Sequence, residues 1–167
     1  MPAPTDPLRV QVLEAVQTKL RAINGNPTYF NTVKSASVVL DPGLGPNMLL
    51  VPSTELPYMI VEVMPSGSKF YMPSMRMKED FQIAVIARND TPASASTNLG
   101  RRMDTWEQLI ADIEVALTRD ITLGGLAVDV RLLTPTPAFD MAASSTIVVV
   151  QPVAIKLIRE YGKPWNS

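Results

Sequence analysis

Two acidic pairs in the sequence have the side chains that general acid and base catalysis requires. Glu79 is followed by Asp80, and Asp112 lies two positions before Glu114. Paired carboxylates act together only when both converge on one cleft. Adjacent residues on a strand, and residues two apart on a helix, point in different directions. We therefore expect these four carboxylates to lie on solvated faces.

Nucleophilic catalysis and phosphate binding have equally weak candidates. Ser144 and Ser145 have no histidine partner, because the chain contains no His and no Cys. Lys156, the one candidate base for a Ser/Lys pair, falls in a strand-like segment, where a solvent-facing lysine is the simpler interpretation. Gly43 and Gly45 form a GxG without the following helix start that a phosphate cradle needs. The sequence therefore predicts no catalytic or cofactor-binding residues and no cofactor.

For a soft metal ion, methionine thioethers are the candidate ligands. The missing His and Cys exclude imidazole and thiolate ligands. Methionines cluster in the middle of the chain and could bind a soft metal. At strand spacing, adaptable packing in a core or an interface is the better interpretation of these side chains. They are Met59, Met64, Met72, Met75 and Met77. We predict no metal site.

Length and composition indicate a globular protein without an electrostatic preference for polyanions. The 167 residues fit one domain, predicted over residues 1–167 with long loops at 41–57, 89–98 and 134–145. Fifteen basic and sixteen acidic residues give a net charge of −1, which disfavours a stand-alone DNA-binding role and tolerates self-association. The first nine residues do not read as a signal peptide, and no apolar stretch is long enough to span a bilayer. We expect a soluble chain.

Two amphipathic helices are predicted. The first is capped by Thr5 or Asp6 and ends near residues 24–27, with apolar residues at helical spacing from Leu8 to Ile23. The second is capped by Thr97 or Asn98 and is stopped by two glycines. Its apolar face has steps of four and three residues. Its glycine stop is Gly124 and Gly125, and its exposed face is expected to carry Asp104, Glu107, Asp112, Glu114 and Arg119.

Strand-like alternation surrounds these helices. Strands are predicted at residues 33–40, 58–64, 75–88, 128–132 and 146–160, with a hairpin turn at 65–68 and a return at 70–72. Apolar side chains from Met77 to Ala87 share odd positions and indicate one buried face. Pro152 implies a sheet edge or a bulge at its position. The order predicts an α+β fold: a largely antiparallel or mixed β-sheet with two main helices packed on it.

Three features are candidates for contacts with other molecules. The apolar loop segment either folds onto its own core or docks into a neighbouring subunit. Two arginines in the first turn of the second helix oppose the helix dipole, so they are either solvated or face an acidic partner. A tryptophan near the end of the chain is either a clasp on the domain or an aromatic anchor. The candidate interface residues are Met48, Leu49, Leu50, Val51, Arg101, Arg102 and Trp165.

Several stretches together resemble the tail terminator, or tail completion, proteins of tailed bacteriophages. A first helix ending at Ile23-Asn24-Gly25 is followed by Tyr29 and a strand that leads into a Pro-rich loop. A later helix reads WEQLIADIEVAL at residues 106–117, followed by DITLGGL at 120–126 and VDVRL at 128–132. A long closing strand ends in IREY at residues 158–161. The likeness covers most of the chain as a pattern of elements and contains no catalytic motif.

The resemblance implies a structural virion protein without enzymatic activity. Such a protein forms a ring, as a homohexamer, on the last ring of the tail tube, stops tube growth and presents a surface to the head. Its implied partners are further copies of itself, the tail tube protein, a head-completion or connector protein, and the sheath protein if the tail is contractile. DNA passes through the lumen without specific binding, and no membrane is involved. The implied location is the tail or neck of the virion, assembled in the host cytoplasm.

Alternatives to the tail terminator remain open at this point. Within the same class, a head-completion or neck (head–tail connector) protein fits the same features. From another class, a small phage-encoded binding or assembly-chaperone module fits them too, and an enzyme ranks last. Gel filtration separates the classes, because a ring is several times heavier than the 18.2-kDa chain.

Overall fold

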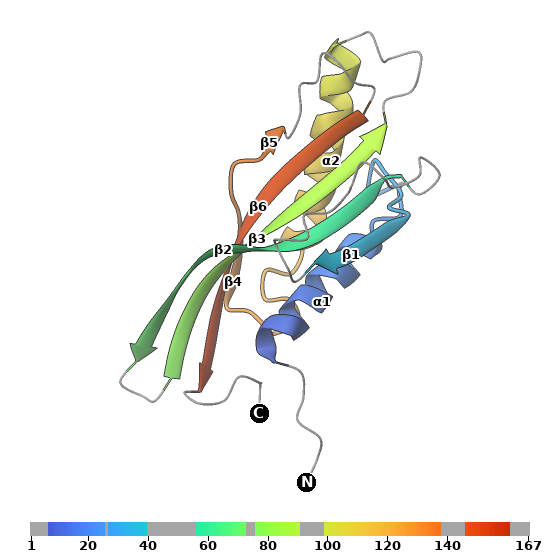
Figure 1. The fold of residues 1–167 in the computed structure, drawn as a ribbon. Helices are drawn as coiled ribbons and strands as arrows, with labels where there is room; N and C mark the ends of the chain where they lie inside the picture. Colours follow the sequence, from blue (N-terminus) through green and yellow to red (C-terminus); the bar gives the residue numbers. More distant parts are fainter. Residues whose placement is uncertain are drawn as a thin grey trace.

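Two helices pack on one face of a β-sheet (Figure 1). The structure is a computed structural model that describes residues 7–25, 27–39, 56–72, 76–90, 99–137 and 146–160. In chain order the elements are α1 (Leu8–Arg21), β1 (Ser35–Val39), β2 (Tyr58–Met72), β3 (Arg76–Asp90), α2 (Leu99–Thr118), β4 (Asp129–Leu132), β5 (Thr136–Pro137) and β6 (Thr146–Glu160). This arrangement confirms the predicted α+β class.

The sheet is mostly antiparallel, with one parallel pair at its edge. Its strands follow the order β1-β2-β3-β6-β4, and β5 also pairs with β6. β1 runs parallel to β2, with Ser35 opposite Tyr58, whereas the other strand pairs are antiparallel. The two longest ladders join β3 to β2 and to β6, so β3 is the central strand of the sheet.

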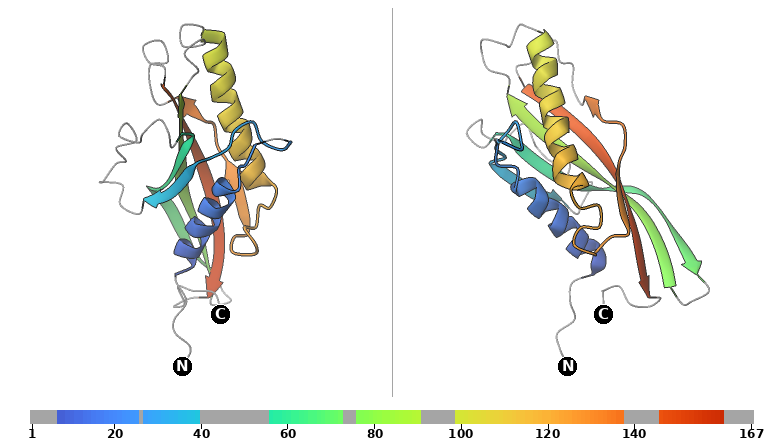
Figure 2. Two further views of the ribbon diagram at one scale, coloured as in Figure 1. Left: turned by 90° about the vertical axis from the view of Figure 1, so that its right-hand side faces the viewer. Right: turned by 180° about the vertical axis from the view of Figure 1, so that it is seen from behind.

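The hydrophobic core lies between the sheet and the two helices, which cover the same face (Figure 2). Odd-numbered side chains of β3 and β6 point into it, as their alternation predicts. The helices supply residues at steps of three and four. The core includes Leu8, Val12, Val16, Leu20, Phe81, Ile83, Val85, Leu109, Ile113, Leu117, Val149, Val153, Ile155 and Leu157.

The start of α1 and the end of α2 differ from the prediction. The N-cap of α1 is Pro7, whose carbonyl accepts hydrogen bonds from the amides of Val10 at 2.8 Å and Gln11 at 3.1 Å. The predicted caps Thr5 and Asp6 lie outside the described residues, as do Thr97 and Asn98. α2 ends at Thr118, before the predicted stop at Gly124 and Gly125. The two glycines instead belong to the turn that follows the helix.

The predicted hairpin turn at residues 65–68 is wrong. β2 continues through this stretch to Met72, and its register with β3 shifts between Val63 and Gly67. A Pro-Ser-Gly-Ser cluster therefore makes a β-bulge here, because pairing with β3 holds both sides of it in one strand. At Gly67 the backbone approaches β3 so closely that a Cβ would lie 2.6 Å from the carbonyl oxygen of Asp80.

Pro152 lies in the interior strand β6, in an unbroken register with β3, and not at the sheet edge or bulge that the sequence predicts. Its carbonyl oxygen accepts a hydrogen bond from the amide of Leu133 at 2.9 Å, so the side of β6 that its nitrogen faces is the side of β4 and β5. Leu133 lies between those two short strands. The missing N–H of Pro152 therefore interrupts no regular ladder.

Residues 68–72 of β2, 76–80 of β3 and 156–160 of β6 form a three-stranded extension, which we call the arm. The strands pair row by row, from Ser68, Asp80 and Lys156 at its base to Met72, Arg76 and Glu160 at its end. Figures 1 and 2 show the arm projecting beyond the layer of helices, at the end of the molecule away from the start of α2.

Of the three predicted loops, only parts are described. Residues 41–55, 91–98 and 138–145 lie outside the description. In the part of the second loop that is described, β3 continues to Asp90, so this loop begins later than predicted. The third contains the two-residue strand β5, which local sequence does not indicate because it depends on pairing with β6.

Candidate functional site

The candidate interface residues are not brought together by the described structure. Met48, Leu49, Leu50, Val51 and Trp165 lie outside the described residues. The backbone of Arg101 and Arg102 lies in the first turn of α2, as predicted, and their side chains are outside the description. The roles proposed for these seven residues therefore stay predictions.

Glu79 was expected on a solvated face, and this expectation is wrong. Its side chain is 1% exposed and forms ion pairs with Arg9 of α1 and, at 3.4 Å, with Arg159 of β6. The Arg9 guanidinium also lies over the ring of Phe81, 5.0 Å from its centre. Glu79 is at an odd-numbered position of β3, and these positions face the core. Two arginines offset the cost of burying its charge. The cluster joins α1 to the base of the arm.

Asp112 is also buried, contrary to the prediction of an exposed face. It is 1% exposed, and each of its oxygens accepts hydrogen bonds from the loop before β1. The amide of Phe30 donates to Oδ1 at 2.8 Å. The amide and the side-chain Nδ2 of Asn31 donate to Oδ2, also at 2.8 Å. The loop covers this side of α2, which local periodicity does not reveal. Asp112 is a structural link between loop and helix.

The turn after α2 explains the DITLGGL stretch. Asp120 accepts hydrogen bonds from the Thr122 hydroxyl at 2.6 Å, the Gly124 amide at 2.7 Å and the Thr122 amide at 3.0 Å, and from Lys19 at 3.3 Å. These donors, the Thr122 hydroxyl foremost, hold the pKa of the Asp120 carboxyl well below its usual range. Gly124 and Gly125 have φ angles of 73° and 89°, where glycine is favoured. This motif builds a turn.

The arm carries a large share of the exposed apolar surface. Phe70, Tyr71, Met72 and Ile158 are 53%, 69%, 40% and 36% exposed. Phe70, Lys78 and Ile158 stand opposite one another in one row across the three strands. Their even-numbered positions place them on the face away from the helices, which we call the outer arm face. Lys78 lies over the Phe70 ring, 5.6 Å from its centre.

A recess continues the outer arm face toward β4. Its volume is about 280 Å³, and its charged lining residues are Lys78, Asp80, Asp129, Arg131 and Lys156. Lys156 stands opposite Asp80 on one side and Asp129 on the other. Both aspartates have a closer partner: Asp80 lies 3.6 Å from Lys78, and Asp129 lies 2.6 Å from Arg131. Asp80 Oδ1 is buried without a hydrogen-bond donor within the described residues.

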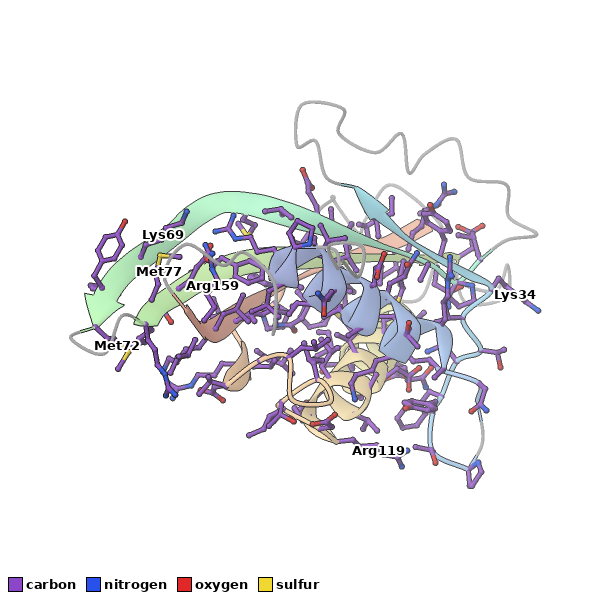
Figure 3. The ribbon with its side chains drawn as sticks, turned by 90° about the horizontal axis from the view of Figure 1, so that it is seen from below. Lys34, Lys69, Met72, Met77, Arg119 and Arg159 are labelled. Atoms are coloured by element: carbon purple, nitrogen blue, oxygen red, sulfur yellow. The ribbon has the colours of Figure 1, made fainter. Side chains whose placement is uncertain are left out.

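A second, smaller cavity lies on the opposite side of the arm, at the start of α1. It measures about 120 Å³ and is lined by Arg9, Lys69, Glu79, Arg159 and neighbouring apolar side chains. Figure 3 shows Lys69, Met77 and Arg159 gathered on the arm, far from Lys34 and Arg119 at the other side of the molecule. Cationic side chains therefore lie on both faces of the arm.

The arm was not recognised in the sequence as a candidate site. A signal was present: the consecutive apolar residues Phe70, Tyr71 and Met72 are preceded by Lys69 and followed, four residues after Met72, by Arg76. The mistaken hairpin turn hid it, because it reduced this strand end to a short return. Of the clustered methionines, Met59 and Met77 are buried as predicted, whereas Met72 is exposed at the end of the arm.

Within the described ranges, no group of three or more acidic side chains is placed to hold a metal ion. The helices described are not long and apolar enough to cross a membrane. A comparison of the chain with known protein families finds none that matches it, and a comparison with curated proteins finds no relative. Among the described surfaces, the arm combines exposed apolar side chains with charged ones.

Proposed function

We propose that this protein is a tail terminator, a structural virion protein that closes into a ring, as a homohexamer, on the last ring of a phage tail tube. The observation that carries the proposal is the arm, which projects beyond the helices and exposes apolar side chains at its end. Exposed apolar surface rimmed by charges is typical of protein interfaces. The resemblance over residues 106–132 supports the same function.

The mechanism of such a ring is self-assembly and docking without catalysis. Ring closure requires heterologous contacts, in which one patch of a subunit meets a different patch of the next. Tube growth stops because the ring's tube-facing side fits the tube and its other side does not accept another tube ring. That other side then receives the head-completion or connector protein. A lumen without a concentration of cations lets DNA pass without adhering, because counterion release makes binding scale with the phosphates neutralised.

Removal of the gene from the phage that encodes it tests this function. Without a terminator, tube subunits continue to add, so electron microscopy should show tails of irregular and excessive length that are not joined to heads. Supplying the wild-type gene in trans should restore uniform tails. Tails of normal length, unattached to heads, would contradict the proposal and favour a head-completion protein. A loss of tails altogether would contradict it in favour of an assembly chaperone.

A further inference from the structure

The outer arm face has an excess of positive charge around an apolar centre. Four cationic residues, Arg76, Lys78, Arg131 and Lys156, lie on it or line its recess. The acidic residues there are Asp80, Asp129 and, at the strand position opposite Arg76, Glu160, so the cations outnumber the acids by one. The apolar centre consists of exposed side chains from β2 and β6. These are Phe70, Met72 and Ile158.

The outer face of α2 has the opposite character. From residue 103 to residue 118 the helix contains four acidic residues and no Lys or Arg. Asp112 is buried, and the three exposed acids are Asp104, Glu107 and Glu114. In the described part of the chain none of these three has an ion-pair partner. They form one stripe, since 104, 107, 111, 114 and 118 follow each other at helical spacing.

The acidic stripe and the outer arm face are similar in length, but they lie too far apart to meet within one molecule. Asp104 and Glu114 are ten residues apart, which corresponds to about 15 Å along a helix. Five rows of strand residues span about 13 Å along the arm. Figure 1 shows the arm and the first half of α2 at opposite ends of the molecule. A contact between them therefore requires two copies of the chain.

We propose that the outer arm face of one copy docks on the acidic stripe of α2 of the next copy. The apolar centre packs on the small side chain of Ala111 in the middle of the stripe, and the surrounding cations face Glu107 and Glu114. This inference rests on the proposed ring and specifies the contact between neighbouring subunits. Arm and stripe are different patches of the same chain, so the contact is heterologous and can close into a ring.

Charge reversal on each face separately tests the contact. Arg76→Glu with Lys78→Glu leaves the stripe intact, and Glu107→Lys with Glu114→Lys leaves the arm intact. We expect each variant to be an 18.2-kDa monomer by size-exclusion chromatography with light scattering, whereas the wild type forms a ring. An equimolar mixture should form rings in which the two variants alternate, because each arm then meets a stripe of opposite charge on the other variant. The chain with all four changes, whose net charge is unaltered, should form rings again.

Exposed residues outside both faces supply the matched controls. Lys34→Glu and Glu14→Lys should assemble as the wild type does, and circular dichroism should show that every variant is folded. Wild-type assembly in the arm variant, or a mixture that stays monomeric, overturns the proposed contact. A wild type that is monomeric at every concentration overturns it too, without bearing on tail length in the gene-removal experiment. The failure of the contact and that of the proposed function are thus separable.

Discussion

Asp112→Ala should destabilise the protein far more than its position on a helix surface would suggest. The change removes the acceptor of three hydrogen bonds, each 2.8 Å long, that tie the loop before β1 to α2. Leaving one donor unpaired costs about 1–3 kcal/mol when it is buried. Phe30 is largely exposed, so water can replace part of the loss at its amide. We therefore expect a loss of about 3 kcal/mol in the free energy of unfolding.

Urea unfolding followed by circular dichroism, at one fixed protein concentration, measures this loss. For a chain of this size, about 3 kcal/mol corresponds to a fall in Tm of roughly 6–12 °C. Glu114→Ala, two residues along the same helix and exposed, is the matched control and should change stability by less than about 0.5 kcal/mol. Amide exchange at Asn31 should accelerate in the Asp112 variant alone. Equal stability of the two variants would refute the link between loop and helix.

Four further predictions concern Glu79, Asp120, the segment at residues 48–51 and DNA. Glu79→Gln removes the counter-charge shared by Arg9 and Arg159 and should cost about 2 kcal/mol in urea unfolding, because Arg159 is mostly buried whereas water can solvate Arg9. Asp80 is partly exposed, so Asp80→Asn should cost under about 1 kcal/mol. Asp120→Asn should lower stability at pH 7. Because the folded-state pKa of that carboxyl is depressed, the difference from wild type should shrink as the pH falls below about 3.9. Leu49→Ser with Leu50→Ser should convert rings to monomers with a native circular dichroism spectrum; an unfolded variant would place the segment in the subunit's own core. Duplex DNA should show no measurable binding at physiological salt, and submicromolar affinity would favour a neck or DNA-binding role.

Patterns with a short period predicted most of the core. Alternation placed Phe81, Ile83 and Val85 on one face of β3, and helical spacing placed Ile113 and Leu117 on the buried side of α2. These predictions succeed because burial on a strand or helix follows directly from its geometry. The same alternation includes position 79, so the burial of Glu79 was predictable from parity. Its charge led to the wrong expectation.

Features that depend on distant segments could not be predicted in this way. The parallel pairing of β1 with β2 and the short strand β5 have no local signature. Asp112 is buried by a loop about 80 residues earlier in the sequence. The Pro-Ser-Gly-Ser cluster near Gly67 is typical of a turn, but the ladder with β3 makes it a bulge. The arm exists because β2 pairs with β3 beyond Gly67, so the prediction of a turn there excluded it.

A cryo-EM reconstruction of the virion would locate every copy of this chain in the particle. We expect a ring of six copies between the last ring of the tail tube and the head-completion or connector protein, with the arm of each copy on α2 of its neighbour. A ring in that position with other contacts between subunits would contradict the proposed interface. Density for the chain elsewhere in the particle, or its absence from the mature virion, would contradict the assignment as a tail terminator.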